Sequence, residues 1–202
     1  MKKLTLIIFI ISFSIGSLSS NQIIGGPGQR LGGFAPQDTL IVNINATLRI
    51  PARIGLYVDA NIGWDLYTPA TGSPSQTYPP TVFPGYYYPN TASTINPQGV
   101  YVQVFSNSAT MTWFLEIRGS GNFHTTIPIS QLLVAPDGST PPSEGQLPSA
   151  PWLSLSTQYQ QLNSGGKTNG WASYPKDFLF VTDEDDEPGN YSVTVSFRLY
   201  AQ

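Results

Sequence analysis

Residues 188–202, the closing stretch of the chain, read PGNYSVTVSFRLYAQ. From residue 191 onward, every second position holds an apolar or aromatic residue: Tyr191, Val193, Val195, Phe197, Leu199 and Ala201. This period of two, rich in β-branched and aromatic residues, predicts a strand with one buried and one solvent-facing side. The Pro-Gly-Asn that precedes it has the composition of a turn. The FLFV run at residues 178–181 is the expected partner, so the sequence predicts a closing β-hairpin.

The same alternation marks residues 40–58, where the even-numbered positions are apolar: Leu40, Val42, Ile44, Ala46, Leu48, Ile50, Ala52, Ile54, Leu56 and Val58. This run is too long for one ordinary strand. Because Pro51 cannot donate a hydrogen bond to a neighbouring strand, we expect two strands, at 39–48 and 51–58. A third strand is expected at 62–66, with Trp64 facing inward.

Strands are also expected at 100–104 and 111–117, forming a second hairpin, and at 123–126. Two proline-rich stretches, 67–98 and 135–151, predict long loops. No segment has a hydrophobic period that indicates a helix of useful length. The expected fold is therefore all-β: an Ig-like antiparallel β-sandwich with long Pro/Tyr-rich loops.

The start of the chain has the pattern of a secretory signal peptide. Lys2 and Lys3 precede an apolar run at 4–15, and small residues follow at Ser17 and Ser19. The run is shorter than the roughly 20 apolar residues that span a bilayer, so we expect no transmembrane anchor after cleavage. The expected organisation is a signal peptide at 1–20, a glycine-rich arm at 21–37 and one domain at 38–202. The arm is either a disordered terminus or a strand lent to a neighbour.

Composition narrows the function classes. The chain has no cysteine, which excludes disulfides and thiolate chemistry. Without Lys2 and Lys3, seven basic residues face twelve acidic ones, a net charge of −5. So few scattered cations argue against a nucleic-acid partner, which requires a concentrated positive face. His124 is the single histidine, no nucleophile-elbow motif occurs, and the acids outside one cluster are isolated, so we expect a non-enzymatic protein.

The acidic run DEDDE at 183–187 is the one dense charge cluster. Calcium prefers oxygen ligands, and the speculative ligands are Asp183, Asp185, Asp186 and Glu187. The alternative is a solvated hairpin tip whose charges discourage pairing between sheet edges.

Aromatic side chains in or beside loops are the other candidates for binding. The speculative ligand-binding residues are Tyr86, Tyr87, Tyr88 and Trp171. Their rings have flat faces that stack on sugars, but the same rings also fill cores and hold long loops in place, and we favour the second interpretation.

The acidic loop, the turn at 188–190 and the alternating closing strand resemble the last hairpin of bacterial Ig-like surface domains. WxL-type cell-wall domains and spore-coat-U or pilus-like secreted subunits end similarly. The resemblance implies an Ig-like sandwich at the cell surface, and it carries over no site residues.

We therefore expect an exported structural or adhesive protein of the cell surface, periplasm or medium, such as a filament or coat subunit. Its partners would be copies of itself or other surface proteins, joined by strand addition. One alternative is a secreted carbohydrate-binding module that takes polysaccharide. The second is an outer-membrane β-barrel, against which the small number of long strands counts.

Overall fold

The computed structural model describes residues 22–25, 39–42 and 46–202. Within them, regular structure is almost entirely β-strand, with one 3₁₀ turn, η1 (Ile129–Gln131). The expectation of an all-β fold is confirmed at this level. The expected signal peptide and most of the glycine-rich arm lie outside the described residues. No helix in the described part is long and apolar enough to cross a membrane.

The chain divides into two compact units, Met1–Ile50 and Pro51–Gln202. The second unit thus begins at the proline that interrupts the alternating run. In the first unit, β1 (Gln22–Gly25) pairs in parallel with β2 (Thr39–Val42). The strand expected at 39–48 is therefore shorter, because residues 46–50 are exposed and have no regular structure.

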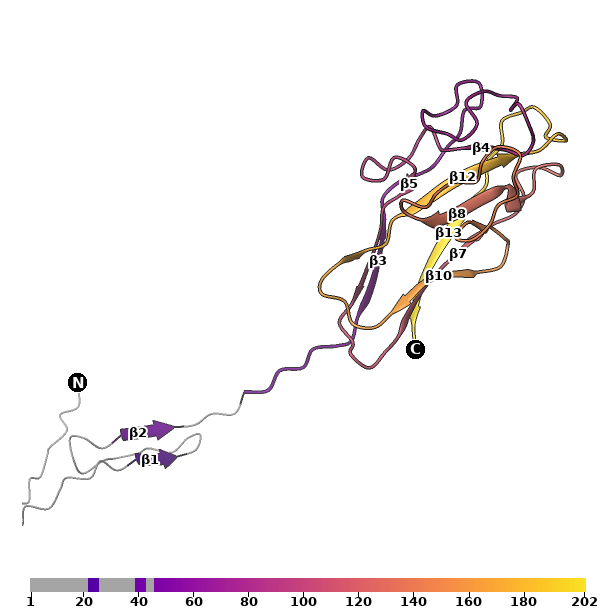
Figure 1. The fold of residues 1–202 in the computed structure, drawn as a ribbon. Coiled ribbons are helices and arrows are strands. Elements are labelled where there is room, and N and C mark those ends of the chain that lie inside the picture. Colours follow the sequence, from indigo (N-terminus) through magenta and orange to yellow (C-terminus); the bar gives the residue numbers. More distant parts are fainter. Residues whose placement is uncertain (1–21, 26–38, 43–45) are drawn as a thin grey trace, which may run out of the picture. The chain divides into compact units, whose positions relative to one another are not determined.

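The second unit contains three antiparallel sheets (Figure 1). Its strands are β3 (Ile54–Val58), β4 (Gly85–Tyr87), β5 (Gly99–Val100), β6 (Val102–Ser106), β7 (Trp113–Gly119), β8 (Leu132–Pro136), β9 (Leu153–Ser154), β10 (Gln160–Gly165), β11 (Ala172–Ser173), β12 (Lys176–Thr182) and β13 (Val195–Ala201). The strand orders are β10-β7-β13, β11-β6-β3 and β4-β12-β8-β9, and β5 also pairs with β12. Only Tyr101 separates β5 from β6, so one extended segment joins the last two sheets.

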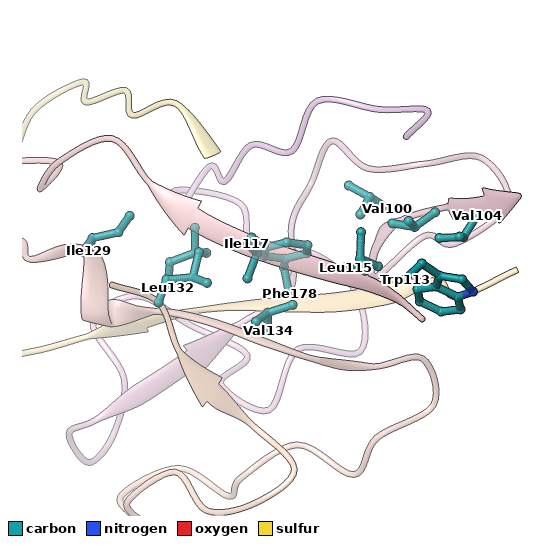
Figure 2. Packing of buried hydrophobic residues seen from close by; sticks show 11 residues of the cluster. Val100, Val104, Trp113, Leu115, Ile117, Ile129, Leu132, Val134 and Phe178 are labelled. Carbon is teal, nitrogen blue, oxygen red and sulfur yellow. The ribbon is translucent and has the colours of Figure 1, made fainter. Parts of the chain in front are cut away.

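One hydrophobic cluster draws on all three sheets. Trp113, Leu115 and Ile117 of β7 are buried in it, as their alternation predicts. Figure 2 shows them in the same cluster as Val134 of β8 and Phe178 of β12. The closing strand β13 pairs with β7, and its apolar side chains also pack against this cluster.

A second cluster covers the opposite face of β12 and β8. It contains Leu179 and Val181 of β12, together with Leu133, Ala135 and Trp152. Tyr86 and Tyr88, from the long loop at 67–98, complete it. The part of the proline-rich stretch 67–98 around Tyr86–Tyr88 is therefore packed against the sheet.

The expected closing hairpin is wrong. β12 pairs with β8, β4 and β5, whereas β13 pairs with β7, with Phe197 opposite Ile117. The expected hairpin of 100–104 with 111–117 is also wrong, because β6 pairs with β3 and β11. In both places the chain crosses from one sheet to another, so that each strand presents its apolar side to the shared core from a different sheet.

The predictions of strands at 62–66 and 123–126 are also wrong. Around Trp64, only Gly63 makes an isolated bridge, to Thr91. Trp64 is instead held by its indole nitrogen, which donates to the Tyr87 carbonyl oxygen at 2.9 Å. Residues 123–126 form a turn in which the amide of Phe123 donates to the Ile127 carbonyl oxygen at 3.0 Å.

Candidate functional site: an apolar cleft beside the closing strand

The three adjacent tyrosines proposed as ligand contacts are buried. Tyr86 and Tyr87 have no exposed surface and Tyr88 is 4% exposed. The Tyr87 hydroxyl donates to the Thr77 carbonyl oxygen at 2.8 Å, and burial raises the pKa of all three phenols. Because stacking on a sugar requires a free ring face, these residues hold the long loop on the sheet, which is the interpretation favoured from the sequence.

Trp171, the fourth proposed ligand contact, is 52% exposed. It lies just before β11, on the β11-β6-β3 sheet, with its ring 5.8 Å from that of Phe105. The tryptophan also covers Gly55 of β3, where an added Cβ would meet the ring at 2.7 Å. The tyrosines belong to the β4-β12-β8-β9 sheet, so the structure does not bring the four rings together.

The acidic run shapes its own loop. The Asp186 carboxylate accepts hydrogen bonds from the Gln131 side-chain amide at 2.7 Å and from the Asp183 backbone amide at 2.9 Å. Burial raises the pKa of Asp186, and the hydrogen bond from Gln131 offsets part of that rise. Asp183, Asp185 and Glu187 are exposed. Among the residues that the structure describes, no group of three or more His, Asp or Glu side chains is placed to hold a metal ion.

One candidate site that the sequence interpretation missed lies beside the closing strand. Two cavities, of about 520 Å³ and about 460 Å³, share Ile62, Val193 and Val195 in their walls. Because they share these residues, the two cavities are described together as one cleft. Its floor reaches Val100 and Phe178, which belong to the main hydrophobic cluster.

The cleft has two chemically different ends. The first is aliphatic and is lined by residues such as Leu56, Val58 and Val193. The second is aromatic and acidic, lined among others by Trp64, Tyr78, Phe123, Phe180, Asp65, Asp186 and Glu187. No lysine or arginine belongs to the lining of either cavity. The described cleft, called the trough below, is thus lined mainly by apolar side chains and has three acidic residues in its second cavity.

Two strands with a free edge border the trough. In the described part of the chain, β3 pairs only with β6, which pairs on its other edge with β11. β13 pairs only with β7. The apolar side chains of β13, Val195, Phe197 and Leu199, pack against the main cluster but stay half-buried. A free edge presents unpaired backbone donors and acceptors, so the cleft offers apolar surface and main-chain hydrogen bonds side by side.

No protein-family model, curated protein or solved structure matches this chain. The arrangement of the cleft therefore carries the functional argument.

Proposed function

We propose that this protein is an exported, non-enzymatic structural component of a cell surface, and that it assembles with other copies of itself. In this proposal the second unit is an Ig-like β-sandwich. One layer is the β10-β7-β13 sheet and the other is formed by the two sheets that the β5–β6 segment joins. The shared burial of β7 and β12 residues in one cluster supports two facing layers.

The observation that carries the assembly proposal is the cleft between β3 and β13, two strands that each have an unpaired edge in the part of the chain that the structure describes. Native proteins normally cover, charge or shorten free strand edges, because such edges pair with other chains. Here Val195 and Phe197 of the end strand β13 line a trough that reaches the core. A compact polar ligand would leave the free backbone groups unused, whereas an extended polypeptide would use both the trough and the edge.

The polysaccharide alternative has less support. With the three tyrosines buried, only Trp171 of the proposed rings is exposed, and it lies on the sheet without the other three. Export itself rests on the pattern at 1–20, which is outside the described residues.

Light scattering on the chain from residue 21 onward tests the proposal. We expect a mass above that of a monomer, rising with protein concentration. Val195→Glu, which places a charge in the cleft, should lower the mass. Ser196→Glu, on the other face of the same strand and opposite Arg118, should not. A monomer at every concentration would contradict the proposal, and thermal melting of each variant checks that it is folded.

A further inference from the structure

We infer that the second cavity of the cleft is a binding site for a small organic cation, a trimethylammonium group on a short uncharged chain, as in choline. The site lies within the second unit and takes a ligand other than a copy of this chain, so the inference goes beyond the proposed assembly. It rests on a wall of aromatic rings in a cavity whose charged lining residues are all acidic.

Three aromatic rings form a continuous series in this cavity. The Trp64 ring lies 6.0 Å from the Phe180 ring, and the Phe123 ring meets the Phe180 ring edge-on at 5.7 Å. All three residues line the cavity and keep part of their surface exposed, and Tyr78 and Tyr191 line it as well. Because the face of an aromatic ring carries partial negative charge, a cation that contacts these rings is attracted to them.

Two of the aromatic residues are held in place by hydrogen bonds. The Trp64 indole nitrogen donates to the Tyr87 carbonyl oxygen, as described above. The Tyr191 hydroxyl donates to the Pro188 carbonyl oxygen at 3.3 Å, and the Tyr191 ring lies 5.2 Å from that of His124. A cavity with side chains that are already ordered loses less conformational entropy when a ligand binds.

Two carboxylates give the cavity a negative charge that no nearby cation neutralises. The Asp65 carboxylate accepts hydrogen bonds from the Tyr67 amide and the Thr68 hydroxyl, both at 3.0 Å. The Asp186 carboxylate likewise accepts from two uncharged donors. Among the described residues, neither aspartate takes part in an ion pair. The cavity therefore has a negative charge to offer a cationic ligand.

The same hydrogen bonds favour a quaternary ammonium over a primary one. Both oxygens of Asp65 and both oxygens of Asp186 already accept a hydrogen bond within the protein. A primary ammonium carries three N–H donors that each need an acceptor, and most of the remaining lining is apolar. A trimethylammonium group has no N–H to satisfy, so ring faces and a negative field are sufficient for it.

The charge of the lining also limits what is attached to the cation. A cavity of about 460 Å³ is within the usual size range of small-molecule sites. Its lining has no lysine or arginine, so a phosphate or carboxylate next to the ammonium would be repelled. The structure thus favours an isolated cation over a zwitterionic lipid headgroup.

Isothermal titration calorimetry with choline chloride tests the inference on the chain from residue 21 onward, at dilutions where light scattering shows a monomer. The matched probe is 3,3-dimethylbutan-1-ol, which has nearly the shape of choline and no charge. We expect one choline per chain, and binding of the neutral alcohol at least about tenfold weaker. Equal affinities, or no saturable binding of choline, would overturn the inference.

Substitutions place the ligand in this cavity. Asp186→Asn preserves the shape of the side chain and should weaken choline binding about fivefold, without changing the binding of the neutral alcohol. Asp185→Asn, in the same acidic run but outside the lining, is the control and should change little. Asp65→Asn replaces Asp186→Asn if that variant does not fold. If Asp185→Asn weakened binding as much, general attraction to the acidic loop would explain it and the assignment would fail.

The ring wall has its own test. Phe123→Leu keeps an apolar side chain and removes one ring, so choline should lose more affinity than the neutral alcohol does. Tyr78→Leu, at a residue that is 43% exposed, replaces it if Phe123→Leu does not fold. An equal loss for both probes would mean that the ring contributes apolar area alone, which contradicts a cation site.

The remaining probes distinguish the sources of the trimethylammonium group. Phosphocholine and vesicles of phosphatidylcholine should bind more weakly than choline, and tighter binding of either would overturn the assignment to an isolated cation. These results are independent of assembly. A chain that binds choline but is monomeric at every concentration supports the inference and contradicts the proposed function, whereas one that assembles without binding choline does the reverse.

Discussion

Strands β12 and β13 are both seven residues long and both carry large apolar side chains, yet their surroundings differ. In β12, Phe178 and Leu179 are completely buried on opposite faces of the strand. In β13, no residue is fully buried. β12 has paired strands along both edges, whereas β13 has β7 on one edge and the cleft beside the other. Apolar content alone therefore does not determine burial; the number of neighbours does.

The open side of β13 is confined to the cleft. On its other face, Tyr200 stacks on Phe114 with ring centroids 5.2 Å apart. Arg198 pairs with Glu116 and lies 3.8 Å above the Tyr159 ring. These contacts order the strand from one side, so the half-buried residues on the cleft side belong to a well-supported strand and not to a frayed end.

The largest predicted effect compares the two strands directly. Phe178→Ala removes a ring from a fully packed position and should lower the free energy of unfolding by about 3–5 kcal/mol. Phe197→Ala removes the same ring from the cleft side, where water already reaches it. We expect a loss of about 1–2 kcal/mol there, because less apolar area leaves the interior.

Urea unfolding at protein concentrations where light scattering shows a monomer measures both values without interference from assembly. Equal losses at the two positions would mean that the cleft is filled within one molecule. That result would remove the structural basis of the assembly proposal.

A second prediction concerns the first residue of β12. Lys176 is buried, and burial lowers the pKa of its amine to about 8, an effect that the charge of Asp177 partly offsets. The unfolded chain keeps a lysine pKa of about 10.4. Between these values the unfolded state binds more protons, so the stability of the parent chain should rise with pH across this range.

Lys176→Met should therefore stabilise the protein by roughly 2 kcal/mol at pH 7, and the gain should disappear towards pH 10. Unfolding curves of both chains at several pH values measure this difference. Lys167→Met, at an exposed position, is the matched control and should have little effect at any pH. A gain independent of pH would show that packing, not the buried amine, is responsible.

The sequence predicted which side of a strand is buried, but it did not predict which strands pair with each other. Alternation assigns Trp113, Leu115 and Ile117 to the inside whatever strand lies next to them. Pairing depends on loops that cross between sheets, which alternation does not record. One signal was available: residues 178–181 are apolar at four consecutive positions, which is typical of a strand covered on both faces. A strand with one solvent-facing side would alternate.

The candidate site was harder to predict because it lies beside two strands that each have an unpaired edge in the described part of the chain. Val193 and Val195 have the same pattern whether a neighbour covers them or not. The tyrosines at 86–88 attract notice as a run, but three consecutive aromatic residues are as compatible with burial on both faces as with a binding surface. The cleft became evident only from the arrangement of β3 and β13.

The smallest predicted effect is on the solvent face of β13. The Arg198 side chain donates to Glu116 Oε2 at 2.9 Å through Nε, and Arg198→Ala would leave the Glu116 carboxylate with the Tyr200 hydroxyl at 3.2 Å. Because the arginine is about half exposed, we expect a loss of about 1 kcal/mol in urea unfolding. Arg118→Ala, which removes only a contact with the Tyr159 ring at 4.5 Å, should cost less.

Assembly distinguishes this face from the cleft. Because Arg198 points away from the trough, its substitution should leave the association measured by light scattering unchanged, while Val195→Glu on the same strand reduces it. If Arg198→Ala weakened association as strongly, the contact between copies would have to include the outer face of the β10-β7-β13 sheet. Association through the cleft predicts the opposite: of the two opposite faces of β13, one governs stability alone and the other governs association.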